Sequence, residues 1–335
     1  MDVINRAEDI GEEIVLSIDG LSKRYDKTKK TTFALKDISF RVRKGEIVGL
    51  LGANGAGKTT IIKCLTGLVK YDSGEITLNS FKIPEQQKHA LNDVAIVLEG
   101  NRNLYWRLTV MENIRYFLSL RKMGKPDEKS IDEMLKRVSL HNDKHTLVEK
   151  LSRGMQQKLN IAIALLCKAK LIILDEPTLG LDIIANHEIV KLLQEIKLQE
   201  NSILVASHDM SLIESIVDRV VLIKNGGMLV DTDVKSLRQL FTSTAYRMCV
   251  ENKHNTTLQR IIGDITSKYG SIVIDGTNEN MWQFIINIYD KSSRENAIEL
   301  ISYFLANDID IEKFERETPD FQHIVSRLLS RELES

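Results

Sequence analysis

One run of the sequence has the residue types needed to hold a chain of phosphates. Residues 52–59, GANGAGKT, fit the pattern G-x-x-x-x-G-K-[ST]. Glycines let backbone N–H groups turn toward an anion, a lysine can reach the β- and γ-phosphates, and the next hydroxyl can ligate Mg²⁺. We therefore predict a nucleoside triphosphate site that uses Gly52, Asn54, Gly55, Ala56, Gly57, Lys58, Thr59 and Thr60.

The elements around this loop can position it. An apolar run of strand type, residues 47–51, precedes the loop, and helical spacing of apolar residues begins at residue 60. A helix N-terminus placed there adds positive dipole character beside the phosphates. This strand–loop–helix order makes a chance match of a glycine-rich turn a poor explanation.

Two acidic residues close a second apolar run. Asp175 and Glu176 follow LIIL at 171–174, as at the end of a buried strand of a parallel sheet. Asp175 would hold Mg²⁺, directly or through water, and Glu176 would act as general base on the attacking water. His208 ends the next apolar run, where the γ-phosphate should lie; elsewhere a lone histidine would be read as structural.

The run LSRGMQQKLNIAIALL, residues 151–166, predicts a helix with Ser152 as its N-cap and a second anion-binding end. With this run, the chain resembles the nucleotide-binding subunit of ATP-binding cassette (ABC) transporters over about residues 14–235. The resemblance rests on the order of the motifs: an aromatic near the N-terminus, 52–59, a loop at Glu99, the signature at 151–156, Asp175-Glu176, LGLD at 179–182 and His208.

The resemblance implies a head-to-tail dimer, either a homodimer or a pair with a related cassette subunit. ATP and Mg²⁺ would lie between one subunit's phosphate loop and the other's signature helix. Ser152 and Gly154 would contact the partner's ATP, and Asp182 would cross the interface. Tyr25 would stack on adenine, although an aromatic on an edge strand is the plainer interpretation.

The sequence departs from the family pattern in two places. Arg153 and Met155 replace a Gly-type and the Gln-type position of the signature, and Arg153 either adds positive charge near the phosphates or points to solvent. Glu99 stands where the family usually has a Gln that touches Mg²⁺. Because a carboxylate is a stronger Mg²⁺ ligand than an amide, we predict tighter coupling of ATP binding to Mg²⁺. The alternative is a Glu99 side chain in solvent.

An aromatic segment, LYWRLT at 104–109, precedes a predicted helix that begins at Thr109, with Glu112 completing a capping box. In the family this region forms a groove for the membrane subunit, and aromatic and Arg side chains are enriched in binding hot spots. Tyr105, Trp106 and Arg107 are therefore the candidate membrane-partner contact. Packing of Trp106 inside its own subdomain is the alternative. The segment resembles subunits that pair with exporter-type (ABC-2) membrane partners.

Composition narrows the classes of protein. The chain has 335 residues and a formal net charge of -1, so no basic field marks a nucleic-acid binder. Its acidic N-terminus is not a signal peptide, and charges interrupt every apolar run before the roughly 18 residues of a membrane span. Cys64, Cys167 and Cys249 are interpreted as core thiols in a reducing compartment. We expect a cytoplasmic protein, peripheral on the inner face of the cell membrane.

The predicted fold class is α/β. Residues 1–13 would be a flexible N-terminus. Residues 14–235 would form a P-loop ATP-binding cassette domain, with a RecA-like core, an antiparallel β subdomain and a helical subdomain at about 99–168. Asn225-Gly226 predicts a hairpin turn. Residues 236–335 read β-α-β-β-α-β plus a helix, the ferredoxin-like split βαβ order, and would be an accessory domain for dimerisation or regulation.

The predicted function is that of an ATP-hydrolysing motor subunit of an ABC transporter, an exporter of a drug, antibiotic, peptide or lipid-linked substrate. The alternative is a soluble ATPase of the same superfamily that acts on ribosomes or DNA. Such proteins usually carry two cassettes or long coiled coils, whereas this chain has one cassette and no heptad run or basic tail. A sensor that binds ATP without hydrolysis is disfavoured by the presence of both Glu176 and His208.

Overall fold

The computed structural model describes residues 13–27, 30–100, 103–121, 127–197, 201–240, 244–251, 262–265, 272–278, 281–288, 293–307, 309–317, 321, 325 and 328. Residues 1–12 of the predicted flexible N-terminus lie outside the described residues. The chain divides into two compact units, Met1–Val234 and Lys235–Ser335. Each unit is considered by itself.

A six-stranded sheet forms the centre of the first unit, in the order β10-β9-β3-β8-β7-β6. Strands β9, β3, β8, β7 and β6 pair in parallel, and β10 is antiparallel to β9. Every residue of β3, β7 and β8 is buried, as expected for strands covered on both faces. The strands are β3 (Ile47–Leu51), β6 (Val94–Val97), β7 (Leu171–Asp175), β8 (Ser202–Ser207), β9 (Arg219–Lys224) and β10 (Gly227–Asp233).

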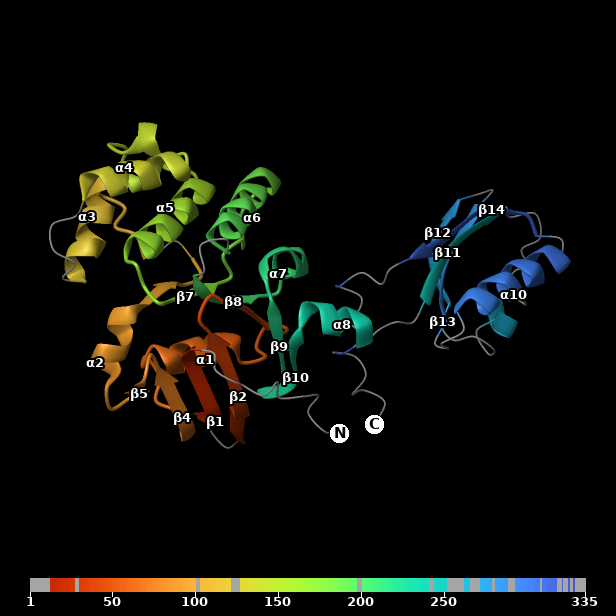
Figure 1. Cartoon of the computed structure of the whole chain (residues 1–335), viewed down its shortest axis with the longest axis horizontal. Coiled ribbons are helices and arrows are strands. Elements are labelled where there is room, and N and C mark those ends of the chain that lie inside the picture. Colours follow the sequence, from red (N-terminus) through yellow and green to blue (C-terminus); the bar gives the residue numbers. More distant parts are fainter. Residues whose placement is uncertain are drawn as a thin grey trace. The chain divides into compact units, whose positions relative to one another are not determined.

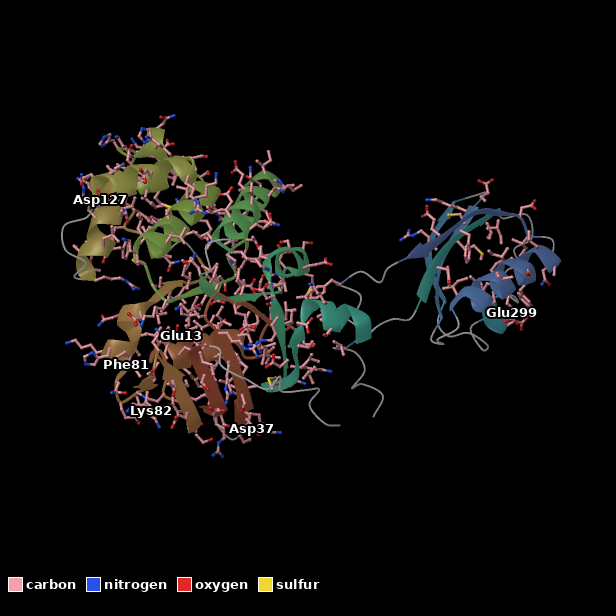
Figure 2. The ribbon with its side chains drawn as sticks, viewed as in Figure 1. Glu13, Asp37, Phe81, Lys82, Asp127 and Glu299 are labelled. Carbon is pink, nitrogen blue, oxygen red and sulfur yellow. The ribbon has the colours of Figure 1, made fainter. Side chains whose placement is uncertain are left out.

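A second sheet of the same unit is antiparallel, in the order β2-β1-β4-β5. Its strands are β1 (Ile14–Lys27), β2 (Lys30–Arg43), β4 (Ser73–Leu78) and β5 (Phe81–Ile83). Asp37 on β2 and Lys82 on β5, both labelled in Figure 2, belong to its two edge strands. One apolar core joins this sheet to the central one, because Leu16 and Ile76 pack in the same cluster as Leu50 and Ile61.

Helices complete the first unit. Helices α3, α4 and α5 gather on the side of the central sheet opposite the antiparallel sheet (Figure 1), where the helical subdomain was predicted. The helices are α1 (Lys58–Leu65), α2 (Gln87–Ala90), α3 (Val110–Leu120), α4 (Glu128–Arg137), α5 (Arg153–Leu166), α6 (Ile183–Lys197) and α7 (Met210–Ile216), and α8 (Val234–Leu240) spans the division between the units. Short 3₁₀ turns are η1 (Leu91–Asp93), η3 (His141–Asp143) and η4 (Val148–Lys150).

Local signals in the sequence correctly predicted several ends of these elements. The Thr109 side chain accepts from the backbone N of Glu112, and the Glu112 carboxylate accepts from the backbone N of Thr109, which confirms the capping box of α3. The Ser152 side chain caps α5. Asn225 and Gly226 have φ of 50° and 78°, as a tight hairpin turn requires, and join β9 to β10.

The second unit contains a four-stranded antiparallel sheet in the order β12-β13-β11-β14. Because β13 lies between β11 and β12, this is the predicted split βαβ arrangement. Its elements are β11 (Thr244–Glu251), β12 (Ile272–Asn278), β13 (Met281–Ile288), α10 (Ser293–Ala306) and β14 (Ile311–Glu317). Residues 262–265, between β11 and β12, are helical, where the predicted order has its first helix; residues 252–261 and 266–271 lie outside the described residues.

The core of the second unit explains one wrong prediction. Met248 and Val250 of β11 face a cluster that includes Leu300 and Phe304 of α10. Cys249 alternates with them and therefore points to the other face of the sheet, where it is only partly buried. It is not a core thiol, whereas Cys64 and Cys167 are buried as predicted. Among the described residues, no helix has the length and hydropathy needed to span a membrane.

Candidate ATP-binding site

The phosphate-loop motif opens onto a cavity of about 400 Å³ at the carboxyl edge of the central sheet. Most of the residues predicted for the site meet there, since β3, β8 and β7 are neighbours. Ala34, Ala53 and Leu179 also line the cavity, although they were not among the predicted site residues. The full lining is Ala34, Ala53, Asn54, Gly55, Gly57, Lys58, Thr59, Thr60, Glu99, Glu176, Leu179 and His208.

Two glycines of the loop are required by its backbone. A Cβ on Gly52 would lie 2.4 Å from the carbonyl oxygen of Ile223 on β9, so no larger residue fits there. Gly57 has a φ of 121°, which side chains rarely adopt, and its Cβ would lie 2.9 Å from the carbonyl oxygen of Ala34. These close approaches fit the two ends of the loop against β9 and β2.

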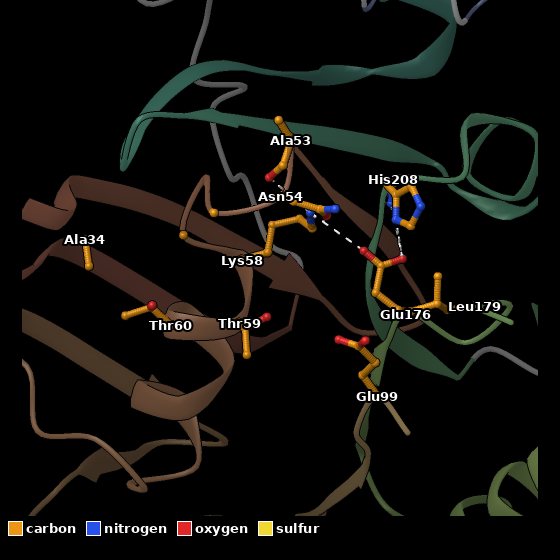
Figure 3. A pocket seen from close by; sticks show the side chains of 12 residues that line it. Ala34, Ala53, Asn54, Lys58, Thr59, Thr60, Glu99, Glu176, Leu179 and His208 are labelled. Atoms are coloured by element: carbon orange, nitrogen blue, oxygen red, sulfur yellow. Dashed lines mark hydrogen bonds and ion pairs between the residues drawn. The ribbon is translucent and has the colours of Figure 1, made fainter. Parts of the chain in front are cut away.

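Lys58 is the buried cation of the site, and it is the first residue of α1. Its Nζ donates to the carbonyl oxygen of Gly52 at 2.7 Å and lies 3.7 Å from Oε1 of Glu176 (Figure 3). The side chains of Lys58 and Glu176 are only 6% and 8% exposed. The Glu176 carboxylate is therefore the counter-ion of the Lys58 ammonium group.

Glu176 is held by residues at the end of β8. Its Oε2 accepts from Ser207 Oγ at 3.0 Å and from the backbone N of His208 at 3.3 Å, and it lies 2.9 Å from His208 Nδ1. Glu176 itself has a φ of 47°, unusual for a residue other than glycine. The predicted base and the predicted histidine are thus in direct contact (Figure 3), and Ser207 is a partner that had no predicted role.

Asp175, the last residue of β7, is 2% exposed. Burial, and then the charges of Glu176 and Glu99, raise the pKa of the Asp175 carboxyl to about 6. Its Oδ1 is buried and, within the described part of the chain, has no hydrogen-bond partner. A buried carboxylate oxygen without a donor fits a Mg²⁺ ligand, since a hard cation would satisfy it. Thr59 and Glu99 both line the adjoining cavity.

The residues predicted to face a partner subunit lie outside this lining. Ser152 caps α5 by accepting from the backbone N of Met155 at 3.2 Å, and the Asp182 carboxylate accepts from the backbone N of Ala185 at 2.8 Å. A Cβ on Gly154 would lie 2.6 Å from the Cβ of Ala185. The signature end of α5 and the start of α6 are therefore in van der Waals contact within one chain.

A second cavity, of about 370 Å³, adjoins the first and shares Glu99, Glu176 and Leu179 with it. Arg153 and Trp106 also line it. The Arg153 guanidinium comes close to Gly180, where an added Cβ would lie 3.2 Å from Nη1. Arg153 thus lies beside the 177–182 loop of its own chain.

The three residues predicted to contact a membrane partner are exposed to solvent. Tyr105 and Trp106 are 49% and 51% exposed and Arg107 is exposed, so Trp106 is not packed wholly inside its subdomain. Their backbone is held by the buried Asn113, which accepts from the backbone N of Tyr105 at 2.9 Å. Tyr25 is 38% exposed and is not part of the cavity lining; Lys23 Nζ lies 5.5 Å from its ring centroid.

A phosphate loop between a central parallel strand and a helix, with an acid pair ending the next-but-one strand of the sheet, defines a P-loop ATPase. Residues 35–179 match the family described as ABC transporter. The chain belongs to the ATP-binding proteins of ABC transporters. It is the ATPase subunit of a transporter.

Three relatives support this assignment. The ABC transporter ATP-binding protein NatA of Bacillus subtilis is 33% identical over 67% of this chain and 91% of the relative. An uncharacterized ABC transporter ATP-binding protein of the same species, YcbN, is 31% identical over 94% of this chain and 97% of the relative. The bacitracin transport ATP-binding protein BcrA of Bacillus licheniformis is 35% identical over 67% of this chain and 72% of the relative.

One solved structure has a fold similar to that of this chain. It is a dimer, which is the state of assembly that the family implies. It is a dimeric ATP-binding cassette in a post-hydrolysis state, bound to ADP and Pi, with a TM-score of 0.59 and 25% identity. The match covers 65% of this chain and 98% of that chain. ABC ATPases pair as dimers and work with membrane subunits. The alternative of an ATPase acting on ribosomes or DNA gains no support from these relatives.

Proposed function

We propose that this chain is the motor subunit of an exporter-type ABC transporter, and that its substrate is a drug, antibiotic, peptide or lipid-linked molecule. The observation that carries the motor role is the Glu176 carboxylate in the cavity, between Lys58 and His208. Export is supported by similarity to a bacitracin transport ATP-binding protein and to a fluoroquinolones export ATP-binding protein of Mycobacterium tuberculosis.

In the proposed dimer, each ATP lies between two copies of the chain arranged head to tail. The loop 52–60 of one copy would bind the phosphates, with Tyr25 against adenine. Ser152 and Gly154 of the other copy would close over the γ-phosphate, and Asp182 would reach across. A head-to-tail arrangement agrees with the separation of these residues from the phosphate cavity in a single chain.

We also propose that Mg²⁺ joins ATP in this site, held by Thr59 and Asp175 with Glu99 as a further ligand. Bound Mg²⁺ would neutralise phosphate charge and orient the terminal phosphate. The orphan Oδ1 of Asp175 supports its part in the site. Glu99 follows β6, and its charge already raises the pKa of the Asp175 carboxyl, so the two groups are close enough to interact.

Hydrolysis would use the contact between Glu176 and His208. With a γ-phosphate beside Lys58, the Glu176 carboxylate leaves the lysine and can accept a proton from the attacking water. His208 lies 2.9 Å from that carboxylate and is 46% exposed, so its ring can hold the carboxylate or turn to the phosphate. Ser207 Oγ would keep the carboxylate in place during the exchange.

Tyr105, Trp106 and Arg107 are the proposed contact with a polytopic membrane subunit of exporter type. Such a contact would hold the chain at the inner face of the cell membrane as a peripheral, cytoplasmic protein. Exposed aromatic rings on a rigid backbone suit this role, since they bury a large area at little entropic cost. The unit Lys235–Ser335 would be accessory, for dimerisation or regulation, and α10 exposes Ile298 and Leu305 for contacts of that kind.

The test is purification of the tagged protein from its native membranes in mild detergent, with Trp106→Ala and Phe33→Ala in parallel. Phe33 is the matched control, because it is also an exposed aromatic, 42% exposed, but lies on the antiparallel sheet. We expect a stoichiometric polytopic partner with wild type and Phe33→Ala that is lost with Trp106→Ala. Ribosomal or DNA-bound proteins in place of a membrane partner would refute the transport role.

A further inference from the structure

A second carboxylate lies next to the Glu176–His208 contact. Asp209 follows His208 and is the N-cap of α7. Its Oδ1 accepts hydrogen bonds from the backbone N of Ser211 and of Leu212, both at 3.1 Å. Capping of α7 is therefore complete with one carboxylate oxygen, and a serine would serve equally well for that purpose alone.

The other oxygen of Asp209 is directed at a different part of the chain. Its Oδ2 accepts from Thr178 Oγ1 at 3.1 Å and from Asn186 Nδ2 at 3.4 Å. Thr178 is 7% exposed and belongs to the loop between β7 and α6. Asn186 lies in the first turn of α6, and its backbone N donates to the carbonyl oxygen of Asp182 at 2.9 Å.

Asp209 is also connected to the proposed base. Its backbone N donates to Ser207 Oγ at 3.0 Å, and Ser207 Oγ donates to Glu176 Oε2 at 3.0 Å. A continuous set of hydrogen bonds thus runs from Glu176 through Ser207 and Asp209 to Thr178 and Asn186. Hydrogen bonds to a charged acceptor are stronger than neutral ones, so the carboxylate is suited to hold this junction.

We propose that Asp209 is a positioning residue that fixes the Asp182 turn relative to Glu176 and His208. The inference rests on the proposed function, in which Glu176 and His208 act on the ATP of their own chain while Asp182 faces the partner. Through Asp209, a shift of the Asp182 turn on dimer closure moves the end of β8, which carries His208. Closure of the dimer would in this way align Glu176 and His208 for hydrolysis.

The decisive variants distinguish two roles of the Asp209 carboxylate: the bridge from Oδ2 to Thr178 and Asn186, and the N-cap of α7 formed by Oδ1. Asp209→Ser keeps an acceptor for the α7 backbone but is too short to reach Thr178 and Asn186. Thr178→Val and Asn186→Ala each remove one of the two hydrogen bonds to Asp209 Oδ2 and leave the cap untouched. We expect each variant to lower kcat for ATP roughly tenfold with KM for ATP unchanged, since alignment for the chemical step is lost and nucleotide binding is not.

Coupling between the residues gives a second measurement. Because Asp209→Ser and Thr178→Val break the same hydrogen bond, the double variant should be no slower than the slower single variant. Asp127→Ser is the matched control for the exchange of an N-cap. Asp127 caps α4 by accepting from the backbone N of Lys129 and Ser130, and it lies at the outer side of the helical region (Figure 2). Its kcat should equal that of wild type.

Two results would overturn the inference: wild-type kcat in Thr178→Val and Asn186→Ala, or fully multiplicative losses in the double variant. If Asp209→Ser does not fold, the Thr178 and Asn186 variants still decide the question. Glu176→Gln in the same assay separates this inference from the proposed function. Full activity of Glu176→Gln refutes the proposed base, whereas its loss alongside unaffected bridge variants refutes only the role of Asp209.

Discussion

Lys58 and Glu176 form a buried ion pair in which Nζ lies 3.7 Å from Oε1. Lys58 is the residue that the phosphate-loop pattern assigns to the terminal phosphates, and Glu176 is the residue proposed as base. The Glu176 carboxylate therefore lies beside the lysine that the pattern assigns to the phosphates, although its proposed role is to deprotonate the attacking water. Binding of a γ-phosphate beside Lys58 would be expected to displace the Glu176 carboxylate, because two anions in a site this buried repel each other.

The Glu176→Gln variant should bind ATP more tightly and hydrolyse it more slowly. The amide removes the negative charge that competes for Lys58, and it cannot accept a proton from water. We expect a loss of about 10²–10⁴ in hydrolysis rate. We also expect an ATP-dependent dimer that persists on size-exclusion chromatography. Asp182→Asn should not reproduce the tighter ATP binding, since the Asp182 carboxylate accepts from the backbone N of Ala185 and does not line the cavity that contains Lys58. An unchanged rate would remove Glu176 from the role of base.

The Glu99→Gln variant should need more Mg²⁺ for half-maximal ATP binding. Glu99 lines the cavity and adds its charge to that of Asp175, a cost that bound Mg²⁺ relieves. Fluorescent-nucleotide titrations at a series of Mg²⁺ concentrations measure the shift. Glu133→Gln, an exposed position on α4, is the control and should leave the curve unmoved. Superimposable curves for wild type and Glu99→Gln would show that Glu99 faces solvent.

The Gly154→Ala variant should destabilise the cassette by about 1–3 kcal/mol, because its Cβ would overlap that of Ala185. The distance between the two Cβ atoms would be 2.6 Å. Thermal or urea unfolding measures the loss, and Ala185→Gly in the same chain should restore most of it. If the restored double variant remains slow in ATP hydrolysis, Gly154 also has a role at the phosphate. Full stability of Gly154→Ala alone would contradict the close packing of α5 on α6.

Replacing Ile183 and Ile184 with Ser should weaken the ATP-dependent dimer and leave the stability of the single chain unchanged. These side chains are 90% and 75% exposed and directly follow Asp182, at the surface proposed to face a second copy. Burial of such a side chain contributes about 1.5–3 kcal/mol. Sedimentation of the Glu176→Gln background with ATP measures the dimer. Leu68→Ser, at a position 66% exposed, serves as control, and equal weakening by that variant would contradict the assignment.

Cys249 should react with iodoacetamide well before the other two cysteines. Burial raises the pKa of the Cys64 thiol to about 11 and also raises the pKa of the Cys167 thiol. The thiolate is the nucleophile, so at pH 8 both buried thiols are protonated as well as shielded. Mass spectrometry after short labelling of the native protein identifies the modified residue. Early labelling of Cys64 would mean that the core around α1 opens readily.

The sequence by itself was sufficient for features that depend on neighbouring residues. The phosphate loop is contiguous, so the types and spacing of residues 52–59 predicted both its chemistry and the strand and helix that flank it. The caps Thr109 and Ser152 and the turn at Asn225 are equally local, and all three were predicted. The split βαβ order of the second unit followed from the sequence of its elements, which leaves few ways to pair the strands.

Only the tertiary structure decided which distant residues meet. The order β3-β8-β7 in the sheet brings Lys58, His208 and Glu176 to one edge, because parallel strands end at the same side. Hydrophobic patterning tells which residues are buried but does not identify the strand that lies alongside. For the same reason the face of Cys249, the contact of Gly154 with Ala185 and the links of Asp209 to Thr178 and Asn186 were not accessible to sequence reasoning. They depend on how segments distant in the sequence pack together, which the local sequence does not determine.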